Sequence, residues 1–261
     1  MYLRETYLPG ERSPRYQFRL PIRSTNDLDI FLTDEMAVNT AGFASIKAVL
    51  RNLKYTVSPK AEYFQFEKEV VVYGAKRTVK IDSLAAPPRE ADEGKVKIKG
   101  IRVRPKGITK IHAFLTEEAR GIDIGRIELH PHKFDSGASA EESPLYIPSR
   151  FNYLILKTGA FFDRKDEGGE KSDYGRHHAY DVFATVTAMS EGDWDNARKH
   201  YEAHKDLQYV QKAGSIRREY FSGETDLGVI RLKENVHYQN NRSELDKYIA
   251  DFLSDLKELL P

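Results

Sequence analysis

Cysteine is absent from the 261-residue chain, which excludes disulfide bonds and zinc sites built on thiolates. The chain also lacks any apolar run of about 18 residues, so we expect no segment that crosses a membrane. No uninterrupted apolar segment follows Met1, as a signal peptide would require, and we therefore expect a cytoplasmic protein. The net charge is only +1, so no global field would attract nucleic acid, and any basic surface must be local.

The residues that are present are typical of a globular protein. Hydrophobic residues make up 40% of the chain and charged residues 31%, which predicts a packed core beneath a well-charged surface. The 15 tyrosines and 13 phenylalanines predict a core rich in aromatic rings. The length allows one large domain or two modest ones.

The most informative stretch begins at Arg23 and ends at Leu32. Its apolar end predicts a short strand, on which Asp27 and Asp29 would point to the same face. Two neighbouring carboxylates repel each other unless a cation lies between them, and Mg²⁺ is the simplest such cation. The alternative is a turn before the strand, in which Asn26 and Asp27 cap the backbone.

A third carboxylate follows on a later predicted strand, from Thr78 to Leu84. Alternation places Lys80, Asp82 and Leu84 on one face of that strand. An unpaired carboxylate on a mostly apolar strand is costly, so Asp82 needs a partner. One hypothesis is a metal ion shared with Asp27 and Asp29, and the other is Lys80.

Two segments are basic. Arg12–Arg23 contains four arginines and no acid, which fits either a solvated loop or an arginine-lined mouth for phosphate. Val96–Val103 predicts a strand that is interrupted at Gly100 and has one basic face. Solvent is the ordinary neighbour of such a face, and RNA or nucleotide phosphate is the alternative.

The pattern changes from mixed to helical at Pro148. Before it, we expect a helix near residues 43–53 and strands at 63–66 and 70–73, with a charged break at 67–69. After it, apolar residues recur at helical spacing as far as the C-terminus, beginning with a helix capped by Ser149. We therefore predict an α+β protein with a mixed sheet and helices over residues 1–147, followed by a mainly helical domain over residues 148–261.

Five motifs together resemble the polymerase-beta-like nucleotidyltransferase superfamily. The first two are RSTNDLDI, residues 23–30, and VKID, residues 79–82, which are similar to an Asp-x-Asp strand and a later strand with a third carboxylate. The other three are LILK, residues 154–157, FFDR, residues 161–164, and RHHAYDV, residues 176–182. They look like the Lys…Arg…Asp array of AbiEii-type toxin nucleotidyltransferases.

This resemblance implies a nucleotidyltransferase fold and transfer of a nucleotide from an NTP to an RNA, such as tRNA, or to a protein. It implies two Mg²⁺ ions bound by Asp27, Asp29 and Asp82, with Asp82 also taking the proton from the acceptor hydroxyl. It also implies a set of residues around the nucleotide: Arg23, Ser24, Thr25, Lys157, Arg164 and Asp181. Lys157 and Arg164 would contact the triphosphate, and Asp181 would orient one of them or form a structural pair.

The sequence departs from that superfamily in one respect. The superfamily has a Gly-Gly or Gly-Ser turn before its Asp-x-Asp strand, whereas only residues 1–26 precede Asp27 here. We therefore expect the first strand of the fold to be missing from residues 1–147. Two alternatives to a toxin-like enzyme follow: an inactive protein of this fold that binds nucleotide or RNA, and an antitoxin-like interaction protein. An antitoxin is in turn a possible partner of an active enzyme.

Overall fold

The computed structural model describes residues 15–16, 27–59, 61, 63–129, 144–168 and 173–261. The chain forms two compact units. We call Ser24–Asp123 the β unit, and Ile124–Pro261 together with Met1–Arg23 the helical unit. Contacts thus divide the chain at residue 123, whereas the composition led us to expect a boundary between 147 and 148. The fold is α+β, as predicted.

A seven-stranded mixed sheet forms the β unit. Its strands are β1 (Asp27–Leu32), β2 (Thr56–Val57), β3 (Gln65–Val72), β4 (Ala75–Ala85), β5 (Val96–Lys99), β6 (Arg102–Pro105) and β7 (Ala113–Leu115). The pairing order is β2-β3-β4-β7-β6-β5, and β1 also pairs with β4. β1 and β7 run parallel to β4, and the remaining pairs are antiparallel.

β4 is the central strand because both of its edges are used. Leu84 and Ala85 pair with β1 and also with β7, so these two strands lie on opposite edges of β4. β3 pairs with β4 from Ala75 to Asp82, just before β7 begins its own pairing at Leu84. Residues that are distant in sequence therefore meet around the end of β4.

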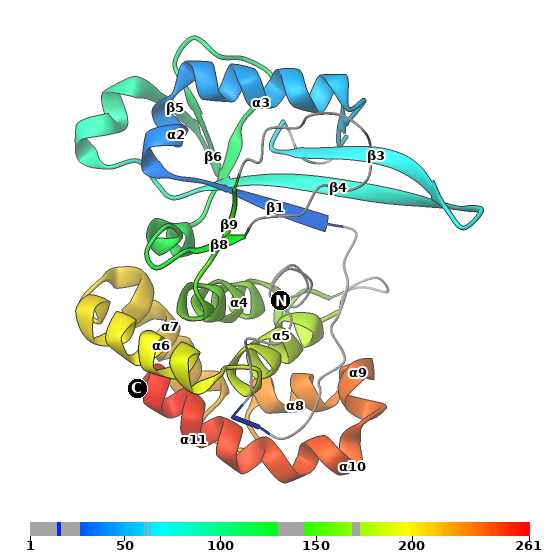
Figure 1. Ribbon diagram of the computed structural model, residues 1–261, viewed down its shortest axis with the longest axis vertical. Coiled ribbons are helices and arrows are strands. Elements are labelled where there is room, and N and C mark those ends of the chain that lie inside the picture. The colour runs from blue at the N-terminus through cyan, green and yellow to red at the C-terminus, as the bar shows by residue number, and fades with distance from the viewer. Residues whose placement is uncertain (1–14, 17–26, 60, 62, 130–143, 169–172) are drawn as a thin grey trace. The chain divides into compact units, whose positions relative to one another are not determined.

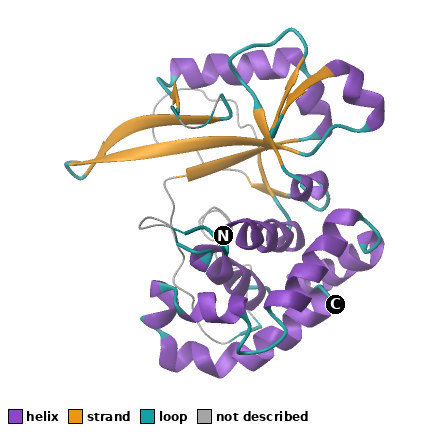
Figure 2. Cartoon of the chain, turned by 180° about the vertical axis from the view of Figure 1, so that it is seen from behind, coloured by secondary structure: helices purple, strands orange, loops and turns teal. Residues whose placement is uncertain are grey.

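Helices α2 (Asp34–Val38) and α3 (Thr40–Asn52) cover one face of this sheet (Figure 1; Figure 2). Thr33 caps α2 and Asn39 caps α3, and the helix predicted near residues 43–53 corresponds to α3. Phe43 from α3 lies fully buried in the core beneath the sheet. Two 3₁₀ helices complete the unit, at Glu90–Lys95 and Glu117–Gly121.

Two strand predictions were wrong. Glu67, Lys68 and Glu69 do not break a strand but lie within β3, which with β4 forms a ribbon running away from the rest of the sheet (Figure 1). A charged side chain on such a ribbon stays in water, so it carries no burial penalty. Gly100, with φ +59°, does not interrupt a strand but begins the two-residue turn between β5 and β6.

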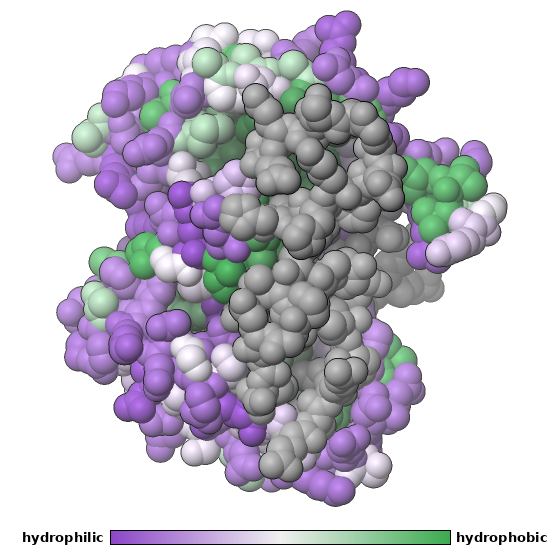
Figure 3. Space-filling model, in the orientation of Figure 1, coloured by the Kyte–Doolittle hydropathy of each residue, from purple (hydrophilic) through white to green (hydrophobic). Residues whose placement is uncertain are grey.

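The end of the ribbon is hydrophobic and exposed. Its turn is formed by Tyr73 and Gly74, which both have positive φ, as a two-residue turn between antiparallel strands requires. Figure 3 shows this end as a hydrophobic projection from the surface, where Val71 and Tyr73 are exposed.

The helical unit contains a small hairpin and eight α-helices within the described residues. The hairpin strands are β8 (Ile127–Leu129) and β9 (Leu145–Ile147). The helices are α4 (Arg150–Arg164), α5 (Arg176–Thr187), α6 (Glu191–His204), α7 (Gln208–Tyr220), α8 (Leu227–Lys233), α9 (Val236–Gln239), α10 (Arg242–Leu245) and α11 (Ile249–Leu259). Ser149 caps α4 as predicted, because its side chain accepts a hydrogen bond from the Asn152 amide.

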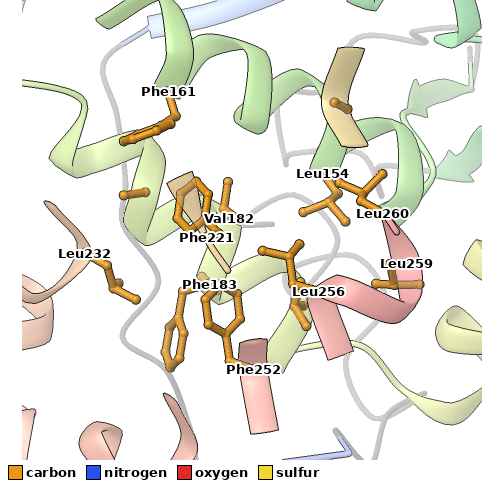
Figure 4. Close-up of a cluster of buried hydrophobic side chains, with 14 of the residues drawn as sticks. Leu154, Phe161, Val182, Phe183, Phe221, Leu232, Phe252, Leu256, Leu259 and Leu260 are labelled. Atoms are coloured by element: carbon orange, nitrogen blue, oxygen red, sulfur yellow. The ribbon is translucent and has the colours of Figure 1, made fainter. Parts of the chain in front are cut away.

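Aromatic rings fill the core of the helical unit, as the composition predicts. Figure 4 shows Phe183 of α5 and Phe252 of α11 pointing toward each other, and their ring centroids lie 5.1 Å apart. In the same cluster, the ring centroids of Phe221 and Phe161 lie 4.9 Å apart. Among the described residues, no helix is both long enough and apolar enough to span a membrane.

Candidate functional site

The three predicted carboxylates lie on one face of the β unit's sheet. Asp29 of β1 is the direct partner of Asp82 in the parallel pairing with β4, and Asp27 is the partner of Lys80. Paired residues share a face, and so do residues two apart on a strand, so all three carboxylates point to the same side. The opposite side carries Ile81 and Leu32, which are buried in the core.

β3 adds a second row of neighbours to these acids. Gln65 lies directly opposite Asp82, on the other edge of β4 from Asp29. Glu67 lies opposite Lys80 in the same way. The face therefore contains two rows across three strands: Gln65, Asp82, Asp29, and then Glu67, Lys80, Asp27. Four carboxylates surround a single lysine in this array.

Asp82 is the acid most affected by this arrangement. One of its carboxylate oxygens, Oδ1, is withdrawn from water and makes no hydrogen bond to any described residue. Burial is the main influence on the carboxyl group, and it raises the pKa above the ordinary value of 3.8. The nearby charges of Asp29 and Asp27 raise this pKa further.

Two neighbours act on Asp82 in the opposite direction. A side-chain hydrogen bond from Gln65 and the positive charge of Lys80 both lower the pKa of Asp82, but their effects do not offset burial and repulsion. A cation placed beside Oδ1 would supply the missing partner and favour the ionised form. Oxygen ligands of this kind suit Mg²⁺ rather than a softer metal ion.

The acids are neighbours without yet forming a closed metal site. Within the described part of the chain, no three side chains of the types His, Cys, Asp and Glu converge as a group that could hold a metal ion. Asp27 and Asp29 are exposed residues at the start of β1. The donor chemistry and the unpartnered Oδ1 fit a divalent cation, and the side chains would have to turn toward one another to bind it.

The helical unit brings Lys157 and Asp181 together. Lys157 of α4 and Asp181 of α5 lie 3.3 Å apart, with side chains only 15% and 10% exposed. The Lys157 ammonium also lies 5.1 Å from the centre of the Tyr153 ring, one turn earlier on α4. Since little water surrounds the pair, removing either partner would leave a poorly solvated charge.

Arg164 does not join that pair. Its side chain is 55% exposed and forms an ion pair with Glu167, at 2.8 Å, near the end of α4. Arg23, Ser24 and Thr25, the other residues predicted around the nucleotide, lie outside the described residues. No geometry therefore bears on these three assignments.

Gln65 and Glu67 are the members of this array that the sequence did not single out. Both lie in a stretch of alternating charge that offers no motif, and their relation to Asp82 and Lys80 depends on strand pairing. The only sequence signal is the tight turn at Tyr73–Gly74, because a two-residue turn fixes the register of the two strands that it joins.

Comparisons of the chain with models of protein families, with curated proteins and with solved structures found no match.

Proposed function

We propose that this protein is a metal-dependent nucleotidyltransferase that moves a nucleotide from an NTP to an RNA or protein acceptor, in the manner of the AbiEii-type toxins. The observation that carries the proposal is the pairing of Asp29 with Asp82 on one sheet face, with Asp27 beside them. The Asp82 oxygen without a hydrogen-bond partner among the described residues supports it, because that oxygen is suited to a cation.

The chemistry follows from the positions of the acids. When bound, two Mg²⁺ ions would align the acceptor hydroxyl with the nucleotide's α-phosphorus and neutralise the pyrophosphate that leaves. Asp27 and Asp29 would hold the cations from β1, and Asp82 would hold one from β4. Asp82 would also take the proton of the acceptor hydroxyl as the new oxygen–phosphorus bond forms.

The roles of the helical residues stay predictions. Lys157 would bind triphosphate oxygens, and Asp181 would keep its ammonium oriented through the contact between them. Arg164 is free to exchange Glu167 for a phosphate, because an exposed ion pair contributes little free energy. Arg23, Ser24 and Thr25 would contact the nucleotide from the segment that leads into β1.

Label transfer tests the proposal. The protein is incubated with Mg²⁺, each labelled NTP in turn and total RNA, and the macromolecules are then separated. We expect label on RNA or on protein with the wild type, and loss of the label with Asp29→Ala. Glu93→Ala, which removes an exposed carboxylate elsewhere in the β unit, is the matched control and should transfer normally. Equal transfer by wild type and Asp29→Ala would contradict the proposal.

A second candidate is binding of nucleotide or RNA without transfer. Lys80 favours it, because a lysine between Asp27 and Glu67 neutralises part of the charge that a metal ion would otherwise neutralise. Saturable NTP binding, measured by equilibrium dialysis in a protein that transfers no label, would support this candidate over the enzyme.

A further inference from the structure

The segment from Lys95 to Lys110 concentrates the positive charge of the chain. It contains five lysines, two arginines and no acid, in the sequence KVKIKGIRVRPKGITK. The chain as a whole has a net charge of +1, so the other residues together carry −6, because +1 less +7 is −6. This concentration of positive charge in residues 95–110 creates a local positive potential that is not visible in the net charge of the whole chain.

The pairing of β5 with β6 places like charges side by side. Lys97 lies opposite Arg104, and Lys99 lies opposite Arg102, on one face of this hairpin. Like charges in directly opposite positions destabilise a sheet, and an anion bound across them would remove the repulsion. The Arg104 guanidinium is held in place by the carbonyl oxygens of Pro105 and Ile108.

The lysines of the segment are exposed. Among the described residues, four of them form no ion pair: Lys97, Lys99, Lys106 and Lys110. Lys95 is the exception, since it contacts Asp92 at 2.7 Å. Since no described residue neutralises them, we expect these four ammonium groups to be available to an external polyanion.

The strand register connects this basic face to the acids. Arg102 of β6 pairs with Phe114 of β7, and Phe114 pairs with Leu84 of β4. Leu84 lies two residues after Asp82 and therefore points to the same side of the sheet. β5 and β6 therefore belong to the same sheet as the strands that carry the acids, with β7 between β6 and β4. The basic side chains and the three carboxylates thus share one face of the β unit.

We propose that the basic face of the β5–β6 hairpin binds the phosphate backbone of a single-stranded RNA, which is the acceptor of the proposed transfer. The inference deepens the proposed function and rests on it for the identity of the acceptor. Lysines that alternate along a strand contact phosphates without reading bases, so the surface binds RNA with little sequence preference.

The character of the face favours RNA over a protein partner. Its four paired residues are all charged, whereas Val96 and Val103 are buried on the other side, which also carries Ile98. A protein interface needs an apolar centre, and this face has none within the paired strands. An anionic membrane is the remaining competitor, because Ile98, on the other side of the hairpin, and Ile101, in its turn, are 51% and 57% exposed.

Fluorescence anisotropy tests the surface directly. A labelled single-stranded RNA of mixed sequence, about 20 nucleotides long, is titrated with the full chain in EDTA without NTP. Lys97→Gln/Lys99→Gln should weaken binding by about tenfold or more and reduce the slope of log K against log salt concentration by about 1.4. Lys97→Arg/Lys99→Arg keeps the charge and should bind as the wild type does.

Lys199→Gln/Lys247→Gln is the matched control, because it removes two exposed lysines of the helical unit that form no ion pair with a described residue. It should bind RNA as the wild type does. Equal weakening in the control, no effect of the Lys97 and Lys99 changes, or no binding by the wild type would each overturn the proposal. So would binding to phosphatidylserine vesicles that depends on Lys97 and Lys99 while RNA binding does not.

The experiment separates this proposal from the proposed function. It contains neither metal ion nor NTP, so it measures RNA binding whether or not nucleotide is transferred. Label transfer without RNA binding that depends on Lys97 and Lys99 would contradict the proposed RNA-binding surface but not the proposed catalysis. RNA binding without label transfer would support the surface and contradict only the catalysis.

Discussion

Asp82 is held in a state that folding alone does not favour. A carboxylate with one oxygen shielded from water normally finds a hydrogen-bond donor, because leaving that oxygen unpaired costs free energy. The nearest charges on the same face include Asp29 and Asp27, which oppose ionisation, and a single Lys80, which favours it. Strain of this kind is common where a side chain serves binding rather than stability.

The free energy of unfolding should respond to Asp82→Asn in a way that reveals this strain. The folded pKa of Asp82 lies above its ordinary value of 3.8, so the native state binds the proton more tightly than the unfolded state. Stability contributed by this group is present below pH 3.8 and is lost as the pH rises through the folded pKa. At pH 7 in EDTA, Asp82→Asn should therefore stabilise the β unit, by up to about 1 kcal/mol.

Magnesium should reverse the order of the two proteins. At a Mg²⁺ concentration tenfold above the dissociation constant, the wild type gains about 1.4 kcal/mol, and Asp82→Asn gains little. Chemical denaturation with and without Mg²⁺ measures both effects. A wild type that is more stable than Asp82→Asn in EDTA would show instead that Asp82 is a satisfied structural residue.

The sequence was enough to predict the direction of each candidate side chain on its own strand. It was not enough to predict which side chains are paired across neighbouring strands. Alternation along two strands was enough to place Asp27, Asp29 and Asp82, because side-chain direction on a strand is local. The direct pairing of Asp29 with Asp82 depends on two strands far apart in the chain, which no local pattern encodes. A structural pair that includes Asp181 was one of the two roles expected for that residue, and its partner is Lys157. The pairing of Arg164 with Glu167 was not expected.

At the scale of elements, the helices were easier to predict than the strands. An amphipathic stripe at helical spacing identifies α4 or α11 by itself, since each buries one face along its whole length. The β3–β4 ribbon has no buried face near its turn, so alternation there carries no signal and β3 appeared to break at residues 67–69. The β5–β6 turn was mistaken for an interruption because a two-residue turn occupies so little sequence.

Close packing of α8 against the end of α7 predicts opposite effects for two glycine substitutions. A Cβ atom on Gly228 of α8 would lie 2.5 Å from the Phe221 ring and 2.5 Å from the Tyr220 carbonyl oxygen. Gly228→Ala should therefore destabilise the helical unit by about 1–3 kcal/mol, despite the higher helix propensity of alanine.

Gly192→Ala is the matched control for that substitution. Gly192 lies in the first turn of α6, and the nearest atom to its added Cβ would be the Ser190 hydroxyl oxygen, 4.0 Å away. With nothing to clash, Gly192→Ala should be neutral or stabilising by up to about 1 kcal/mol. Urea denaturation of both variants tests the contrast, and an equal loss of stability from the two would refute the packing argument.

At the scale of the whole molecule, each unit has a core of its own. The core of the β unit gathers residues of α2, α3 and the sheet around Phe43. The larger core of the helical unit gathers residues from α4 to α11 around Phe183 and Phe252. Because both ends of the β unit join the helical unit in the chain, the sequence offered no single boundary at which composition changes from one unit to the other.

Separate cores predict that a mutation acts on the unfolding of its own unit. Phe43→Ala and Phe252→Ala each remove a fully buried ring, and each should cost about 3–5 kcal/mol. Hydrogen exchange, followed by mass spectrometry, resolves the two units by peptide. Phe43→Ala should accelerate exchange in β3 and β4 and leave α5 and α11 protected, and Phe252→Ala should do the reverse. Acceleration of both units by either variant would mean that they unfold as one cooperative body, and the acids of β1 and β4 would then depend on the helical core for their alignment.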